Sequence, residues 1–129
     1  RVAAVKRILA VLLFALSLSA PVQAYDVEIY VDPRCAGLEG IDLADCSFHL
    51  REKAEADMKK LYRRAMAYTA RKRHLRESQK LWEKFAQYEC SQQGNNSSYV
   101  PVDFSFCYVR KMQHREKEIR RMYLYGADE

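Results

Sequence analysis

The sequence of 129 residues predicts an all-α fold: a helical hairpin plus a C-terminal helix in a disulfide-stapled three-helix bundle, with room for one short β pairing. Three observations support this prediction. No glycine or proline occurs between Gly40 and Gly94, a stretch rich in alanine, leucine, lysine, arginine and glutamate, which are strong helix formers. A stretch rich in glycine, asparagine and serine follows, after which helical periodicity returns. Four cysteines can form two disulfides.

Residues 1–24 have the three-part pattern of a secretory signal peptide. Basic residues lie within residues 1–7, apolar or small residues fill residues 8–20, and residues 21–24 end in a small-residue cleavage site. The apolar run is shorter than the ~20 residues of a membrane-spanning helix, so we expect cleavage after Ala24, with an uncleaved anchor as the alternative.

Cleavage would leave one helical domain, residues 25–129. It would hold 19 basic and 17 acidic residues, so the net charge falls from +5 to +2. Most of the basicity therefore belongs to the leader. We expect a periplasmic or secreted protein that does not span the membrane after cleavage and that binds no nucleic acid.

The first predicted helix follows Asp42 or Asp45. Either carboxylate can cap the helix, because it accepts the unpaired backbone N–H groups of the first turn. Apolar or small residues then recur at steps of three and four, at Cys46, Leu50, Ala54, Met58, Leu61, Ala65 and Tyr68. This spacing places them on one helical face.

A polar run at residues 69–74 interrupts this stripe. The stripe resumes at Leu75, Ser78, Trp82, Phe85 and Glu89. We interpret the pattern as two helices joined by a short basic turn. The alternative is one helix of ~70 Å, since Tyr68, Leu75 and Trp82 stay in phase at steps of seven. The hairpin is favoured because a lone helix of that length has nothing against which to bury Trp82.

Residues 91–106 have the composition of a loop. Their second half alternates in hydrophobicity and could form an edge strand paired with residues 27–31, although Pro101 argues against a longer sheet. A last helix is expected from Cys107, with Gly126 as its stop. Its periodic positions are Cys107, Met112, Ile119 and Met122.

The cysteines all follow the leader, at Cys35, Cys46, Cys90 and Cys107. An even number in a small exported chain predicts two disulfides. Three pairings are possible and the sequence does not decide among them; we favour the two local pairs, Cys35 with Cys46 and Cys90 with Cys107. The spacings lack the close ligand pairs of zinc sites, so we expect no metal and no other cofactor.

The segment Leu75-Arg76-Glu77-Ser78-Gln79-Lys80-Leu81-Trp82, followed by Phe85 and Cys90, resembles the hallmark of the LprI-like lysozyme-inhibitor N-terminal domain family. Cys107, Arg115 and Ile119 are similar to that family's closing Cys, Arg and Leu. Where the family has Arg-Asp after the Phe, this chain has Ala86-Gln87. The resemblance covers about residues 35–123. It implies a small exported bacterial helical domain that inhibits lysozyme, with Leu75, Gln79, Trp82, Phe85 and Arg115 as its motif residues.

Three motif residues have predicted structural roles. Trp82 is expected in the core, because a buried indole dominates packing. Gln79 is expected to hydrogen-bond the backbone of a neighbouring helix or to face a partner. Arg115 is expected to pair with a carboxylate such as Asp57 or Glu89, with a ligand contact as the alternative.

A basic row follows one side of the second helix. Its members repeat every four residues, at Lys72, Arg76, Lys80 and Lys84. The row is either a solvated face, partly neutralised by the acidic N-terminal segment packed nearby, or a docking strip for an anionic polymer or an acidic protein.

The sequence predicts a binding protein rather than an enzyme. It has no phosphate-binding loop, nucleophile elbow, catalytic cysteine signature or metal-binding histidine motif. The favoured hypothesis is an exported lysozyme (muramidase) inhibitor that acts by occluding the enzyme's cleft. Many lysozymes are basic, so we expect contact through the acidic N-terminal segment or the stapled loop. Candidate partner-binding residues in that loop are Asn95, Asn96, Ser97 and Tyr99.

Two alternatives belong to other functional classes. One is a structural or adaptor module of the cell envelope that binds a protein or an anionic polymer through the basic row. The other is an immunity protein against a cell-wall-degrading toxin.

Overall fold

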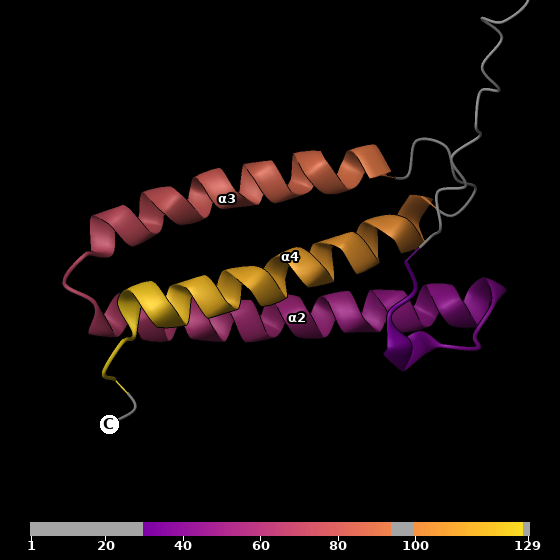
Figure 1. Ribbon diagram of the computed structural model, residues 1–129, viewed down its shortest axis with the longest axis horizontal. Helices are drawn as coiled ribbons and strands as arrows, with labels where there is room; N and C mark the ends of the chain where they lie inside the picture. Colours follow the sequence, from indigo (N-terminus) through magenta and orange to yellow (C-terminus); the bar gives the residue numbers. More distant parts are fainter. Residues whose placement is uncertain (1–29, 94–99, 128–129) are drawn as a thin grey trace, which may run out of the picture.

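The computed structural model describes residues 30–93 and 100–127 and is all-α, as predicted (Figure 1). The elements are a short 3-10 helix and three long helices: η1 (Pro33–Cys35), α2 (Gly40–Tyr68), α3 (Lys72–Gln93) and α4 (Val100–Tyr123). Within these described ranges there is no strand, and no helix is long and apolar enough to cross a bilayer. The predicted leader, residues 1–24, lies outside them.

The central helix of the bundle is α4. It packs extensively along α2 and also against α3, whereas α2 and α3 make few contacts with each other. Figure 1 shows α4 between the other two, with α2 and α4 running in one direction and α3 returning in the other. The position of α3 therefore depends on α4.

Two buried clusters form the core. The larger joins all three long helices through Met58, Leu61, Ala65, Leu75, Met112, Ile119, Tyr123 and Leu124. The smaller, made of Cys35, Val102 and Phe106, lies where η1 and the start of α4 meet α2. Burial of these side chains is the main favourable contribution to folding, at roughly 25 cal/mol per Å² of apolar surface.

The hairpin prediction is confirmed, and the single long helix is excluded. Helix α2 ends at Tyr68, and Thr69 adopts an extended conformation (φ −73°, ψ 142°). The backbone N–H of Thr69 still donates to the Ala65 carbonyl (2.9 Å), while its hydroxyl accepts a hydrogen bond from the Arg71 N–H (3.1 Å). This local hydrogen bond competes with helix continuation, as threonine side chains commonly do at helix ends.

The predicted loop at residues 91–106 is wrong at both ends, and so is the β pairing of its second half. Helix α3 continues to Gln93, and α4 begins at Val100. Pro101 is compatible with this helix because the N–H groups of a first turn have no intrahelical partner. Val102 and Phe106, four residues apart, are both buried on the side that faces Cys35. Helical burial of these large side chains outweighs the strand-like alternation.

The predicted N-terminal caps of α2 are also wrong. The helix begins at Gly40, and its N-cap is Glu39, whose side chain makes no capping hydrogen bond. Asp42 instead lies in the first turn, where a carboxylate interacts favourably with the helix dipole, and Asp45 follows beyond it. At the other end of the bundle Gly126 follows α4 with a positive φ of 80°, in agreement with its predicted role as a stop.

Both local disulfides are present. Cys35 pairs with Cys46 and Cys90 with Cys107, with Cα–Cα distances of 5.9 and 5.5 Å. The first joins η1 to α2, and the second joins the end of α3 to the first turns of α4. Because Cys35 packs against Phe106, the neighbour of Cys107, both crosslinks lie at the end of the bundle opposite the hairpin turn. We call this the stapled end.

Replacing both Cys90 and Cys107 with serine should lower the free energy of unfolding by about 3 kcal/mol. The bond joins residues 17 positions apart, and its loss returns loop-closure entropy to the unfolded chain. Urea unfolding followed by circular dichroism measures the change. The exposed Ser91→Ala variant serves as control and should shift stability by less than about 0.5 kcal/mol. An unchanged midpoint in the double-serine variant would contradict the structural role.

Candidate functional site

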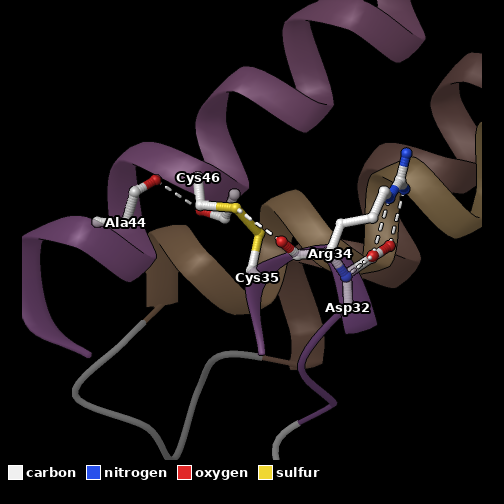
Figure 2. Close-up of a disulfide and its surroundings, with 6 residues drawn as sticks. Asp32, Arg34, Cys35, Ala44 and Cys46 are labelled. Atoms are coloured by element: carbon white, nitrogen blue, oxygen red, sulfur yellow. Dashed lines mark hydrogen bonds and ion pairs between the residues drawn. A yellow bond between two sulfur atoms is a disulfide. The ribbon is translucent and has the colours of Figure 1, made fainter. Parts of the chain in front are cut away.

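The N-terminal part of the stapled end is held by one disulfide and one ion pair (Figure 2). The carboxylate of Asp32 accepts hydrogen bonds from the backbone N–H of Arg34 (2.9 Å) and from its guanidinium Nε (2.9 Å) and Nη2 (2.8 Å). These bonds to Arg34 hold the pKa of Asp32 below its ordinary value, and they raise that of Arg34. The Asp32–Arg34 bonds fix the local conformation of the segment, and the Cys35–Cys46 disulfide joins it to α2.

The second disulfide constrains the connection between α3 and α4. Cys90 and Cys107 are fully buried, so the chain leaves and re-enters the bundle at fixed positions. The partner-binding candidates of this connection lie outside the described residues: Asn95, Asn96, Ser97 and Tyr99.

The described surface of the stapled end is acidic. Residues 35–50 contain three carboxylates and no lysine or arginine. Glu39, Asp42 and Asp45 are exposed, and none forms an ion pair with another described residue. We call these three residues the acidic face. It offers an uncompensated negative potential to a basic partner.

A groove of about 420 Å³ separates α2 from α3, with α4 as its floor. It exists because α2 and α3 both pack on α4 and hardly touch each other. Its aromatic lining comes from three helices, with Tyr62 on α2, Trp82 on α3 and Tyr108 on α4. The rings of Trp82 and Tyr108 are 6.2 Å apart, and Tyr108 stacks on Phe104 at 5.4 Å.

Charged side chains line the same groove. Glu55 lines it from α2 and Glu83 from α3, and both carboxylates interact electrostatically with Tyr108. Burial raises the pKa of Tyr108, and the negative charges of Glu83 and Glu55 raise it further. Lys59 and Arg76 also line the groove. An apolar floor with convergent polar groups is typical of a binding site, and nothing in this arrangement forms a nucleophile with an adjacent base.

The basic row is exposed along its whole length. Lys80 lies 3.7 Å from Glu77 on the same helix, whereas Lys72, Arg76 and Lys84 form no ion pair within the described part of the chain. The expected neutralisation by the acidic N-terminal segment is not found there, because that segment belongs to η1 and α2 and packs on α4. Arg76 and Lys80 instead border the groove.

Arg115 organises the α3–α4 interface, with partners other than those predicted. Its guanidinium donates to Gln79 Oε1 (3.1 Å), Ser78 Oγ (2.8 Å) and Glu118 Oε2 (3.0 Å). The predicted carboxylates are paired elsewhere: Asp57 with Lys53 and Glu89 with Lys111. The guanidinium suits this position because its donors form a rigid planar fork.

Gln79 is buried, but its amide does not bind backbone. The oxygen accepts from Arg115, and the Nε2 group donates to Glu83 (3.3 Å). The network continues through Ser78, whose hydroxyl lies 3.2 Å from the Tyr123 hydroxyl, to His74 Nδ1, 2.6 Å from Tyr123. The roles of Tyr123 and His74 were not predicted. Their separation of 49 residues gives no local signal.

The remaining motif residues differ in burial. Leu75 is fully buried, and Trp82 is only partly buried at the edge of the larger cluster. Phe85, expected on the buried stripe, is 52% exposed, and the Lys111 ammonium lies over its ring at 4.7 Å. Ala86 is fully buried in its place. A small residue there lets α3 approach α4 closely.

Two more expected stripe positions are exposed, Tyr68 at the end of α2 and Met122 near the end of α4. In contrast Met58, Leu61 and Ala65 are buried as predicted. Both errors fall in last helical turns, and at the end of α4 the neighbouring Tyr123 and Leu124 are buried instead.

The part of the chain described by the structure holds no group of three or more His, Cys, Asp or Glu side chains arranged to bind a metal ion. The candidate binding features are the acidic face, the groove and the basic row.

Comparison with known families identifies the chain. A family model described as "Lysozyme inhibitor LprI" matches residues 35–119. The chain belongs to the LprI family. The match includes both disulfides and the Gln79–Arg115 contact, so it spans most of the covalently braced bundle. No curated protein and no solved structure matches the chain.

Arg115→Ala should lower the free energy of unfolding by about 2–3 kcal/mol, because it leaves the buried Gln79 oxygen without a partner. Arg115→Lys should recover less than half of that loss, since one ammonium cannot reach acceptors on two helices in place of the planar fork. Thermal or urea unfolding measures the free energy of unfolding of both variants. Arg120→Ala, on the exposed side of α4, is the control. A full recovery by lysine would contradict the importance of the fork.

Stability should fall in acid as Asp32 is protonated. Its pKa is lowered in the folded state, so its contribution is fully present above the ordinary value of 3.8 and is lost as the pH drops through the lowered value. Glu116 acts in the opposite sense, because burial and Asp57 raise its pKa. The Asp32 contribution is therefore measured as the difference from Asp32→Asn.

We expect Asp32→Asn to destabilise the protein by about 1 kcal/mol at neutral pH, as loss of a capping carboxylate does, and by much less near pH 2. Unfolding midpoints at several pH values measure the difference. A gap between the two proteins that stays constant across this range would contradict the assignment.

Proposed function

We propose that this member of the LprI family is an exported inhibitor of a muramidase, active in the periplasm or outside the cell, that occludes the enzyme's cleft and carries out no reaction. The observation that carries the proposal is the family match over residues 35–119, which coincides with the disulfide-braced bundle. Two disulfides support an oxidising compartment. The proposal includes removal of residues 1–24 as a leader.

The stapled end is the proposed contact surface. Residues 35–50, which carry the acidic face, contain no lysine or arginine, and muramidases with a basic surface would be attracted to this face. The connection between Cys90 and Cys107 leaves from the same end and is closed by a covalent bond. A closed loop loses little conformational entropy on entering a cleft, so more of the contact energy appears as affinity.

A test uses the purified exported protein in a cell-wall lysis assay with muramidases of several classes. Inhibition should occur at micromolar concentration or below with at least one class. Charge reversal of the acidic face, by Glu39→Lys, Asp42→Lys and Asp45→Lys together, should weaken inhibition at least about tenfold, equivalent to 1.4 kcal/mol.

The matched control reverses three bases of the basic row: Lys72→Glu, Arg76→Glu and Lys84→Glu. It changes the same number of charges on a different helix and should leave inhibition within about twofold, since distant exposed charges act mainly through screened fields. Absence of inhibition with every enzyme class would overturn the proposed function. Loss of inhibition only in the control would show that the contact surface lies on α3 and not on the acidic face.

A second candidate is an envelope adaptor that binds a protein or an anionic polymer through the basic row. One observation favours it: Lys72, Arg76 and Lys84 are exposed without ion-pair partners in the described residues. Salt-sensitive retention on an immobilised polyanion that is lost in the charge-reversed control variant would support this function. Retention unaffected by those substitutions would remove it.

A further inference from the structure

The hairpin carries a block of basic residues with no acidic residue among them. Residues 58–76 contain eight lysines and arginines and no aspartate or glutamate. This block includes the end of α2, the turn and the first residues of α3. Its net charge of +8 is the highest of any stretch of this length in the chain, and its sign is opposite to that of residues 35–50.

The fold adds further bases from α4. The last turn of α4 carries Arg120 and Arg121, and Figure 1 shows that this helix ends beside the hairpin turn. These side chains are exposed, as are Arg63 on α2 and Arg73 on α3. Three helices therefore present bases at one end of the bundle. We call it the basic end.

Two of the acidic residues described near the basic end, Glu77 and Glu118, are already engaged. Glu118 binds Arg115 at 3.0 Å, and Glu77 lies 3.7 Å from Lys80. Arg63, Arg73 and Arg121 form no ion pair with any described residue. The positive potential of this end is therefore left for an external partner.

Exposed aromatic and apolar side chains lie among these bases. Tyr68 is 54% exposed, Tyr125 is 87% exposed and Met122 is 40% exposed. Tyr68 ends α2, and its hydroxyl lies beside Gly126, so the two tyrosines come from adjacent parts of the same surface. Tyrosine combines an apolar ring with a polar tip, which suits a boundary between water and an apolar phase.

We propose that the basic end docks on the surface of a bilayer that contains anionic phospholipids. The bases would interact with the lipid headgroups, and Tyr68, Tyr125 and Met122 would enter the interfacial region. A soluble polyanion would satisfy the charges but would leave these three side chains in water. The combination of charge and exposed aromatic rings favours the bilayer.

Docking in this way would orient the molecule. Helix α2 has 29 residues and is therefore about 43 Å long, so the stapled end would stand well away from the headgroups. The acidic face, repelled by the same lipids, would point toward the solution. This inference rests on the charge distribution and holds whether or not the protein inhibits a muramidase.

The experiment measures co-sedimentation of the exported protein with two kinds of vesicle, phosphatidylcholine alone and phosphatidylcholine mixed with phosphatidylglycerol. Binding should occur only to the anionic vesicles and should weaken as salt increases. The variant Arg63→Gln, Arg73→Gln, Arg121→Gln removes one base from each helix. It should weaken binding about 100-fold, given the contribution of each base near an anionic surface.

The matched control, Lys53→Gln, Lys84→Gln, Lys111→Gln, removes three bases away from this end and should retain binding within about threefold. Circular dichroism confirms that both variants are folded. A further variant, Tyr68→Ser with Tyr125→Ser, keeps every charge. It should weaken vesicle binding severalfold while leaving the affinity for soluble polyphosphate unchanged.

Three results would overturn the proposal. They are no binding to anionic vesicles at low salt, equal loss in the control and in the basic-end variant, and binding to polyphosphate without binding to vesicles. Inhibition of muramidases by the basic-end variant is measured separately, so loss of vesicle binding and loss of inhibition are distinguishable.

Discussion

The architecture depends on the attachment of α3 to α4. Helix α2 is bound to α4 along most of its length, but α3 makes few contacts with α2 and relies on α4 alone. Leu75 packs against α4, and Glu89, His74 and Ser78 make polar contacts with it. Two interactions fix its position at separate points. The Cys90–Cys107 disulfide fixes the stapled end, and the hydrogen bonds of Arg115 with Ser78 and Gln79 fix the middle. Ala86, fully buried, allows the close approach between them. The groove exists because neither interaction draws α3 toward α2.

Much of this fold could be predicted from local sequence signals. The long stretch without glycine or proline, the interrupted stripe and the polar turn at residues 69–74 were sufficient for the hairpin, because helix propensity and periodicity act over short distances. The two local disulfides, favoured among three possible pairings, are both present. The start of α4 could not be predicted in this way. Residues 100–106 alternate like a strand, and only their packing against Cys35 and α2 makes them helical.

The candidate site was less accessible to prediction than the fold. A family resemblance selected Arg115, Gln79 and Trp82. It gives no information on which side chains of the same chain these residues contact. The network from Arg115 to His74 depends on contacts between residues 36 to 49 positions apart. The groove is a consequence of how three helices pack, and no single helix carries a pattern for it. The charged surfaces are easier to predict than the groove, because the acidic face and the basic block at residues 58–76 are each formed by one continuous stretch of sequence.

The position of Trp82 has a practical consequence. It is the sole tryptophan of the chain, and it lines the groove beside Tyr108 while remaining only partly buried. Its fluorescence emission therefore arises from one known place in the molecule. Any occupant of the groove, and any change in the spacing of α2 and α3, would alter the polarity around that indole and shift the spectrum. The native protein thus contains an optical probe of its own interhelical space, without chemical labelling.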